Sequence, residues 1–154
     1  MLVVAQTRSG GTGALRDAVL AGVEQARREV EGADVEVRSL HAFDAGPDDV
    51  LWADAIVLAT PEHFGSMSGA LKDFFERVFY PCVDHTKGRP YAIVVKGGHD
   101  GQGTVLSIRR IVAGLEWREV VEPVVAVGDV TEAHLAAATE LGATVAAGLV
   151  AGLW

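Results

Sequence analysis

The residues best suited to chemistry lie in one short segment, Thr7-Arg8-Ser9-Gly10-Gly11-Thr12-Gly13. It follows the apolar run Leu2–Ala5 and precedes a helical pattern, which predicts a buried strand, a turn and then a helix. Such a turn gathers backbone N–H groups at the positive end of the helix dipole, which favours an anion. Hydroxyl groups and glycines that let a ligand approach the backbone come from Thr7, Ser9, Thr12, Gly10, Gly11 and Gly13. We therefore predict a phosphate site, and the alternative is a plain turn in which Thr12 caps the helix.

A second segment, Pro61–Gly69, carries residues suited to a flat ligand. It follows the buried run Ala55–Thr60 and is expected to be a loop, with a rigid proline at its start, two flat side chains and an exposed backbone N–H at Gly65. The flat side chains are His63 and Phe64. His63 is a candidate ring contact or proton donor, against the alternative of an exposed loop histidine. For Phe64 the alternative is a place in the core.

A third segment, Lys96–Thr104, is a glycine-rich loop after the fourth apolar run. Gly97 and Gly98 offer a flexible wall with little side-chain bulk. His99 and Asp100 are a candidate acid/base pair, and the plain alternative is a polar wall. Together the three segments suit a planar heterocycle on a phosphorylated tail.

The elements that position these segments alternate along the whole chain. Strand patterns lie at Leu2–Ala5, Val35–Leu40, Ala55–Thr60, Tyr91–Val95 and Pro123–Val127. Helical patterns lie at Thr12 to about Glu31, where Gly32 ends it, at Asp48–Leu51, at Leu71–Val78, at Leu106–Leu115 and after the N-cap Thr131. Strict alternation predicts an α/β fold, a three-layer, doubly wound, five-stranded parallel sheet of order 2-1-3-4-5, in a single domain over residues 1–154. In that order strands one, three and four are neighbours, so the three segments meet beyond their carboxyl ends.

Two other nucleotide motifs fit the sequence less well. A Walker A loop needs a lysine before its Ser or Thr, and Gly98–Thr104 has the glycine spacing without it. A dinucleotide fingerprint beginning at Gly11 would need Gly or Ala at the position of Arg16. His, Cys, Asp and Glu show no metal-ligand spacing, so we expect no metal site.

Composition narrows the function classes. The sequence has 154 residues, of which 49% are hydrophobic and 22% charged, which is typical of a globular domain. A net charge of -8 argues against a nucleic-acid partner, which requires a basic face. A single cysteine, Cys82, excludes an internal disulfide and favours a reducing compartment. No signal peptide is visible and the weakly polar stretch Leu141–Trp154 is too short for a membrane span, so we expect a cytoplasmic protein.

Two of the segments carry a family resemblance. Thr7-Arg8-Ser9-Gly10-Gly11-Thr12 resembles the Thr/Ser-x-Thr/Ser-Gly-x-Thr phosphate loop of flavodoxins. Thr60-Pro61-Glu62-His63-Phe64-Gly65-Ser66-Met67-Ser68-Gly69-Ala70-Leu71-Lys72-Asp73-Phe74 is similar to the ring-contacting segment of flavodoxin-like NAD(P)H:quinone oxidoreductases and FMN reductases. The second match is the more specific of the two.

The resemblance implies a flavodoxin-like domain that binds FMN. It implies phosphate contacts from Thr7, Ser9, Gly10, Gly11 and Thr12, ring contacts from Pro61, Glu62, His63, Phe64 and Gly65, and a further wall from Gly97, Gly98 and His99. The flavin carries the chemistry in such proteins, so no side chain is required as a catalyst and His63 is the one candidate.

The resemblance also implies a function. We expect an oxidoreductase that passes electrons from NAD(P)H to a quinone or similar small acceptor. The alternatives are a flavodoxin-type electron carrier acting on a redox partner protein, and a flavodoxin-like binding domain without flavin. Electron carriers usually stack a tyrosine or tryptophan from the fourth-strand loop, where this chain has no aromatic residue except His99. Trp154 is a candidate contact in a homodimer.

Overall fold

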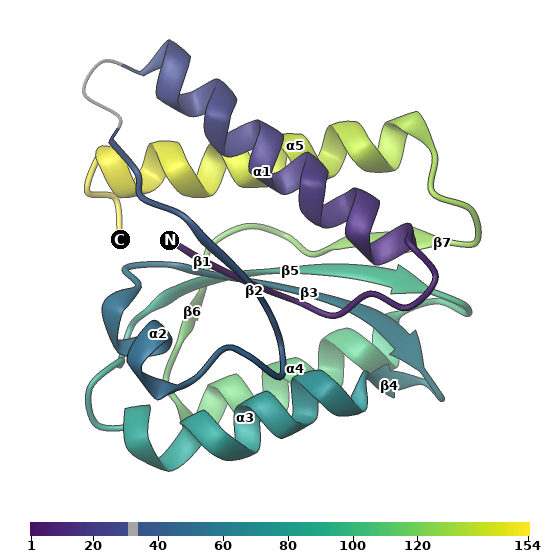
Figure 1. The fold of residues 1–154 in the computed structure, drawn as a ribbon, viewed down its shortest axis with the longest axis horizontal. Helices are drawn as coiled ribbons and strands as arrows, with labels where there is room; N and C mark the ends of the chain where they lie inside the picture. The colour runs from purple at the N-terminus through teal and green to yellow at the C-terminus, as the bar shows by residue number, and fades with distance from the viewer. Residues whose placement is uncertain (31–33) are drawn as a thin grey trace.

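The computed structural model describes residues 1–30 and 34–154 as an open sheet between two helical layers (Figure 1). The strands are β1 (Leu2–Ala5), β2 (Arg38–His41), β3 (Ile56–His63), β4 (Ser66–Met67), β5 (Pro90–Gly97), β6 (Arg118–Glu119) and β7 (Val124–Val127). The helices are α1 (Gly11–Glu29), α2 (Pro47–Trp52), α3 (Gly69–Cys82), α4 (Gln102–Gly114) and α5 (Glu132–Val150).

The parallel sheet has the predicted order. β2, β1, β3 and β5 lie side by side, and β6 and β7 share the edge beyond β5. The first, second, third, fourth and fifth predicted strands therefore correspond to β1, β2, β3, β5 and β7, and the flavodoxin-like order 2-1-3-4-5 is confirmed. The edge is divided because β6 pairs with the start of β5 and β7 with its end. Pro123, which lies between them, has no N–H to donate to a ladder.

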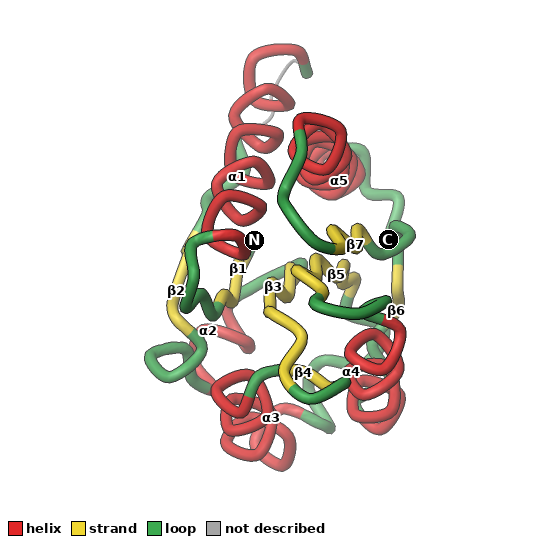
Figure 2. Tube along the Cα trace, turned by 90° about the vertical axis from the view of Figure 1, so that its right-hand side faces the viewer, coloured by secondary structure: helices red, strands yellow, loops and turns green. Residues whose placement is uncertain are grey.

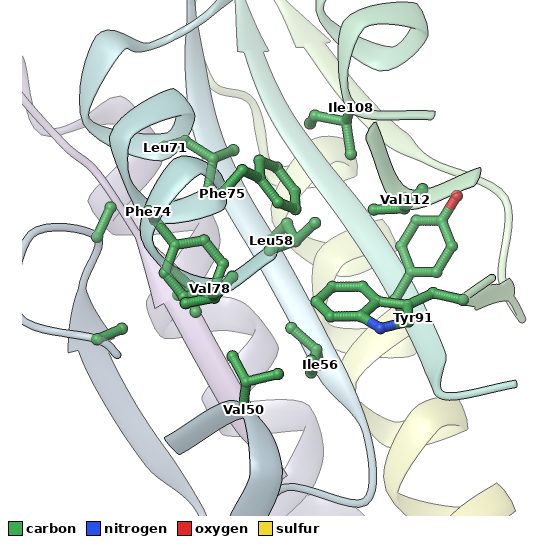
Figure 3. Packing of buried hydrophobic residues seen from close by; sticks show 14 of the residues in the cluster. Val50, Ile56, Leu58, Leu71, Phe74, Phe75, Val78, Tyr91, Ile108 and Val112 are labelled. Atoms are coloured by element: carbon green, nitrogen blue, oxygen red, sulfur yellow. The ribbon is translucent and has the colours of Figure 1, made fainter. Parts of the chain in front are cut away.

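Helices cover both faces of the sheet, as Figures 1 and 2 show. α1 and α5 lie on one face, and α2, α3 and α4 on the other. The central strand β3 is buried on both sides: Ile56 and Leu58 pack toward α3 and α4, and Val57 and Ala59 toward α1 and α5. This explains its unbroken apolar run. Figure 3 shows the α3 and α4 side, where Phe74 and Phe75 fill the space between helix and sheet.

Two glycines bring α1 and α5 into backbone contact. A Cβ on Gly22 would lie 1.9 Å from the Thr139 carbonyl oxygen, and a Cβ on Gly142 would lie 2.1 Å from the Val19 carbonyl oxygen. Any larger residue at either position would push the helices apart. Among the described helices, α5 has the length and apolar composition of a membrane span, and its buried side packs against α1 and the sheet.

The start of α1 and the start of the second strand differ from the sequence expectations. α1 begins at Gly11, one residue early, and the predicted stop at Gly32 lies outside the described residues. The second strand begins at Arg38 and not at Val35, because Leu2, the first residue of β1, already pairs with Arg38. Thr131 caps α5 as predicted, and its Oγ1 accepts a hydrogen bond from the His134 N–H at 3.4 Å.

Candidate functional site

The turn after β1 presents its backbone at the start of α1. Ser9 and Gly10 are exposed, and Gly10 has a φ of 87°, which glycine adopts without strain. Thr7 Oγ1 accepts a hydrogen bond from the Gly13 N–H at 3.2 Å. The side chain that satisfies the helix start is therefore Thr7, and the alternative in which Thr12 caps the helix is wrong. Thr12 is buried, with 2% of its surface exposed.

The first turn of α1 keeps donors available for a ligand. The N–H groups at a helix start have no intrahelical acceptor. Within residues 1–30 and 34–154, no hydrogen bond is made by the N–H groups of Gly11 and Thr12. Gln6 Oε1, at the end of β1, is buried and also without a partner in this part of the chain. The N–H groups of Gly11 and Thr12 and the hydroxyl of Ser9 can donate to a phosphate, whereas Gln6 Oε1 is an acceptor and needs a donor instead.

The predicted Pro61–Gly69 loop is a β-hairpin. Pro61, Glu62 and His63 continue β3, and β4 pairs antiparallel with it through Glu62↔Met67 and His63↔Ser66. The hairpin turns at Phe64 and Gly65, whose φ values are 53° and 72°. Two successive residues with positive φ give the tight turn that suits twisted strands.

The hairpin places Phe64 in solvent. Its relative exposure is 109%, so the alternative that buries it in the core is wrong. His63 is half-buried, and its side chain forms no hydrogen bond within the described residues. At the base of the hairpin, Thr60 Oγ1 lies 3.1 Å from Ser68 Oγ, and Ser68 Oγ accepts from the Leu71 N–H to cap α3. This buried pair fixes the hairpin between β3 and α3.

The third segment is shorter than the predicted loop. Lys96 and Gly97 end β5, and α4 already begins at Gln102, which leaves residues 98–101 as the loop. Asp100 Oδ1 accepts from the Gln102 N–H at 2.9 Å and so satisfies the start of α4. This carboxylate does not pair with the His99 side chain in the described structure, so the acid/base alternative lacks support.

Glu62 joins the hairpin to this loop. Its Oε2 accepts hydrogen bonds from the N–H groups of Gly98 (2.9 Å) and His99 (2.7 Å). Both N–H groups are therefore occupied by the Glu62 carboxylate, which ties the loop after β5 to the hairpin. On the other side, a Cβ on Gly103 would lie 2.1 Å from the Gly65 carbonyl oxygen. The hairpin is thus held by β5 and α4 together.

The structure brings all three segments to one edge of the sheet. They follow the carboxyl ends of β1, β3 and β5, which are neighbours. Lys96, which the sequence analysis assigned to the glycine-rich loop, brings the first and third segments into contact. Lys96 points to the α1 side of β5, and its Cγ lies 3.0 Å from where a Cβ on Gly11 would be. The sequence could have predicted this position, because side chains alternate between the two faces of a strand and Lys96 follows Ala92 and Val94 at a spacing of two.

Two hollows and the resolved pKa shifts lie away from this edge. One hollow of about 550 Å³ is lined by Trp52, Asp54 and Trp154, and a groove of about 500 Å³ lies between α3 and α4. The Arg109 guanidinium lowers the pKa of Glu119, and burial raises the pKa of the Cys82 thiol. Neither hollow is therefore part of the candidate site, which is lined by the backbone amides of the three segments.

Known proteins share both the sequence and the fold. Residues 1–132 match the family described as NADPH-dependent FMN reductase. The chain belongs to this family. Family membership therefore supports FMN as the cofactor.

Individual relatives agree with this assignment. A flavodoxin of Aquifex aeolicus (strain VF5) is 30% identical over 115 residues, which cover 75% of this chain and 59% of that protein. A flavodoxin from the domain Archaea superposes with a TM-score of 0.78 at 20% identity, covering 94% of each chain. An NADH:FMN oxidoreductase in its apo form gives a TM-score of 0.71 at 20% identity, covering 94% of this chain and 88% of that one. The two structural likenesses show the fold.

Proposed function

We propose that this protein holds FMN at the carboxyl edge of its sheet and passes electrons from NAD(P)H to a quinone or similar small acceptor. The observation that carries this proposal is the convergence of three donor-rich segments beyond β1, β3 and β5. The family match over residues 1–132 supports FMN as the occupant. We place the whole site in one domain over residues 1–154.

Each segment has its own task in this proposal. The phosphate lies against Thr7, Ser9, Gly10, Gly11 and Thr12. The ring lies between the hairpin residues Pro61, Glu62, His63, Phe64 and Gly65 and the wall formed by Gly97, Gly98 and His99. Bound FMN supplies the hydride and electron transfer, and the protein supplies binding, orientation and amide dipoles near the ring. No side chain is needed as an acid or base, and His63 remains the candidate for a proton donor.

The reductase is favoured over the electron carrier by the shape of the edge. Residues 98–101 carry no Tyr, Trp or Phe that could cover the ring. An uncovered ring face leaves room for NAD(P)H and then for an acceptor. The carrier stays the second candidate because the Aquifex aeolicus relative and the archaeal neighbour are both named flavodoxins.

Anaerobic mixing with NAD(P)H separates the candidates. The FMN-loaded protein is titrated with NADH or NADPH, and the visible flavin absorbance is followed, first without and then with a soluble quinone. A reductase is bleached rapidly and regains its colour as the quinone is consumed. Slow bleaching with either nucleotide, with rapid reoxidation by a redox protein, favours the carrier. A protein that takes up no FMN supports the flavin-free domain.

A further inference from the structure

Lys96 lies beside the phosphate turn although it belongs to β5. Alternation along β5 directs its side chain to the face covered by α1 and α5, as Ala92 and Val94 are directed. Its stem runs past the first residue of α1. A Cβ on Gly11 would lie 3.0 Å from Lys96 Cγ and 3.4 Å from Lys96 Cε. Gly11 therefore leaves the space that the lysine occupies, and the ammonium, one bond beyond Cε, lies at the first turn of the helix.

The Lys96 ammonium forms no ion pair with the described residues. The other two lysines of the chain, Lys72 and Lys87, each form an ion pair, with Glu76 and Glu116 respectively. Lys96 Nζ makes only a long hydrogen bond to the Gly97 carbonyl oxygen, at 3.4 Å. The side chain is half-buried. An unpaired cation held beside the positive end of a helix is unfavourable unless an anion joins it.

We infer that Lys96 is the charge that selects phosphorylated flavin. This inference rests on the proposed FMN site. The N–H groups of the turn bind the phosphate by dipoles, and Lys96 adds a full positive charge from the neighbouring strand. Riboflavin, which has the same ring and no phosphate, gains nothing from Lys96. The lysine is thus a specificity residue that acts on the tail of the cofactor and leaves the ring untouched.

Arg8 is the competing source of positive charge. It lies in the phosphate turn itself and is exposed. An exposed arginine is screened by water and salt and loses side-chain entropy when it binds, so its contribution is small. The Lys96 stem is half-buried beside Gly11 and therefore loses less freedom on binding. Removing the charge of Lys96 is therefore expected to weaken FMN binding more than removing the charge of Arg8.

The test is calorimetric titration of the apoprotein with FMN and, separately, with riboflavin. The variants are Lys96→Met, which keeps the stem without the charge, Lys96→Arg, Arg8→Met, and Lys87→Met as a control with the same change of net charge. Lys96→Met is expected to raise the Kd for FMN roughly 10- to 100-fold and to change the Kd for riboflavin less than about twofold. Lys96→Arg and Lys87→Met keep FMN binding close to wild type. The wild-type preference for FMN over riboflavin also falls with rising salt more steeply than that of Lys96→Met.

Other results overturn specific steps. Unchanged FMN affinity in Lys96→Met, or an equal loss of FMN and riboflavin, overturns the assignment to Lys96 and leaves the FMN site standing. A large loss in Arg8→Met with none in Lys96→Met moves the charge to Arg8 and also overturns it. A wild-type protein that binds neither flavin overturns the proposed function itself, so the two failures are distinguishable.

Discussion

Replacement of Gly103 by alanine tests how the ring-binding hairpin is held. A Cβ on this α4 residue would lie 2.1 Å from the Gly65 carbonyl oxygen, where carbon and oxygen normally stay about 3.3 Å apart. The backbone therefore has to move by about 1.2 Å, because the neighbouring atoms belong to the Gly65 backbone and not to a flexible side chain. Either the hairpin turn at Phe64 and Gly65 moves away or the start of α4 does. Overpacking of this kind costs about 1–3 kcal/mol.

The same strain predicts the loss of cofactor affinity. If FMN binds only when the hairpin is in its wild-type position, binding has to return the displaced hairpin to that position. This weakens the binding free energy by about 1–3 kcal/mol, which raises Kd roughly 5- to 150-fold. The apoprotein loses about 2–12 °C in Tm, since 1 kcal/mol corresponds to about 2–4 °C for a chain of this size. FMN titration and thermal unfolding of Gly103→Ala measure the two effects.

Gly142→Ala is the matched control for this experiment. Its Cβ would also lie 2.1 Å from a carbonyl oxygen, that of Val19, but at the contact between α1 and α5. It is expected to lower Tm by a similar amount and to leave the FMN Kd of the folded protein unchanged. Gly69→Ala, which has nothing within 4 Å, reports the gain in helix propensity alone. Wild-type FMN affinity in Gly103→Ala, or an equal loss in Gly142→Ala, would show that the contact between Gly103 and Gly65 does not position the hairpin for FMN.

Two further predictions follow from single side chains. Ser9→Glu places a carboxylate in the exposed phosphate turn and is expected to weaken FMN binding by at least about tenfold, whereas Ala21→Glu on the exposed side of α1 has no such effect; calorimetry with both variants checks this. Glu119, whose pKa is lowered by Arg109, stabilises the fold above its ordinary pKa of 4.5, and this contribution is lost as the pH falls below that value. Because the Arg109–Glu119 pair is half-exposed, Glu119→Gln is expected to lose about 0.5–1 kcal/mol of unfolding free energy at pH 7 and to match wild type in acid. Urea unfolding at a series of pH values measures this difference, and a difference that stays constant with pH contradicts the assignment.

The sequence was sufficient for the sheet and its order. The runs Leu2–Ala5, Ala55–Thr60 and Tyr91–Val95 are almost wholly apolar because their strands are covered on both faces. Such runs can be recognised in the sequence without knowing which strands pair with them. Alternation with helices then restricts the topology to a few choices. Thr131 was found as an N-cap for a similar reason, since the cap contacts a residue only three positions away.

The site was predicted less completely because its contacts join distant parts of the chain. Pro61 argues against a strand, yet β3 continues through it because β5 pairs beside it. The bond from Glu62 to the loop after β5 spans 36 residues, and the contact of Lys96 with Gly11 crosses from β5 to α1. Sequence spacing carries no signal for such pairs. Gly103 was assigned to a flexible loop for the same reason, although it is a helical residue that makes room for Gly65.

Titration of the purified wild-type protein with FMN is the most direct test of the FMN site. We expect a change in the visible flavin spectrum that saturates at one FMN per chain, and a Tm that rises with FMN concentration because FMN binds the folded state. An unchanged flavin spectrum together with an unchanged Tm would contradict the FMN site at the ends of β1, β3 and β5.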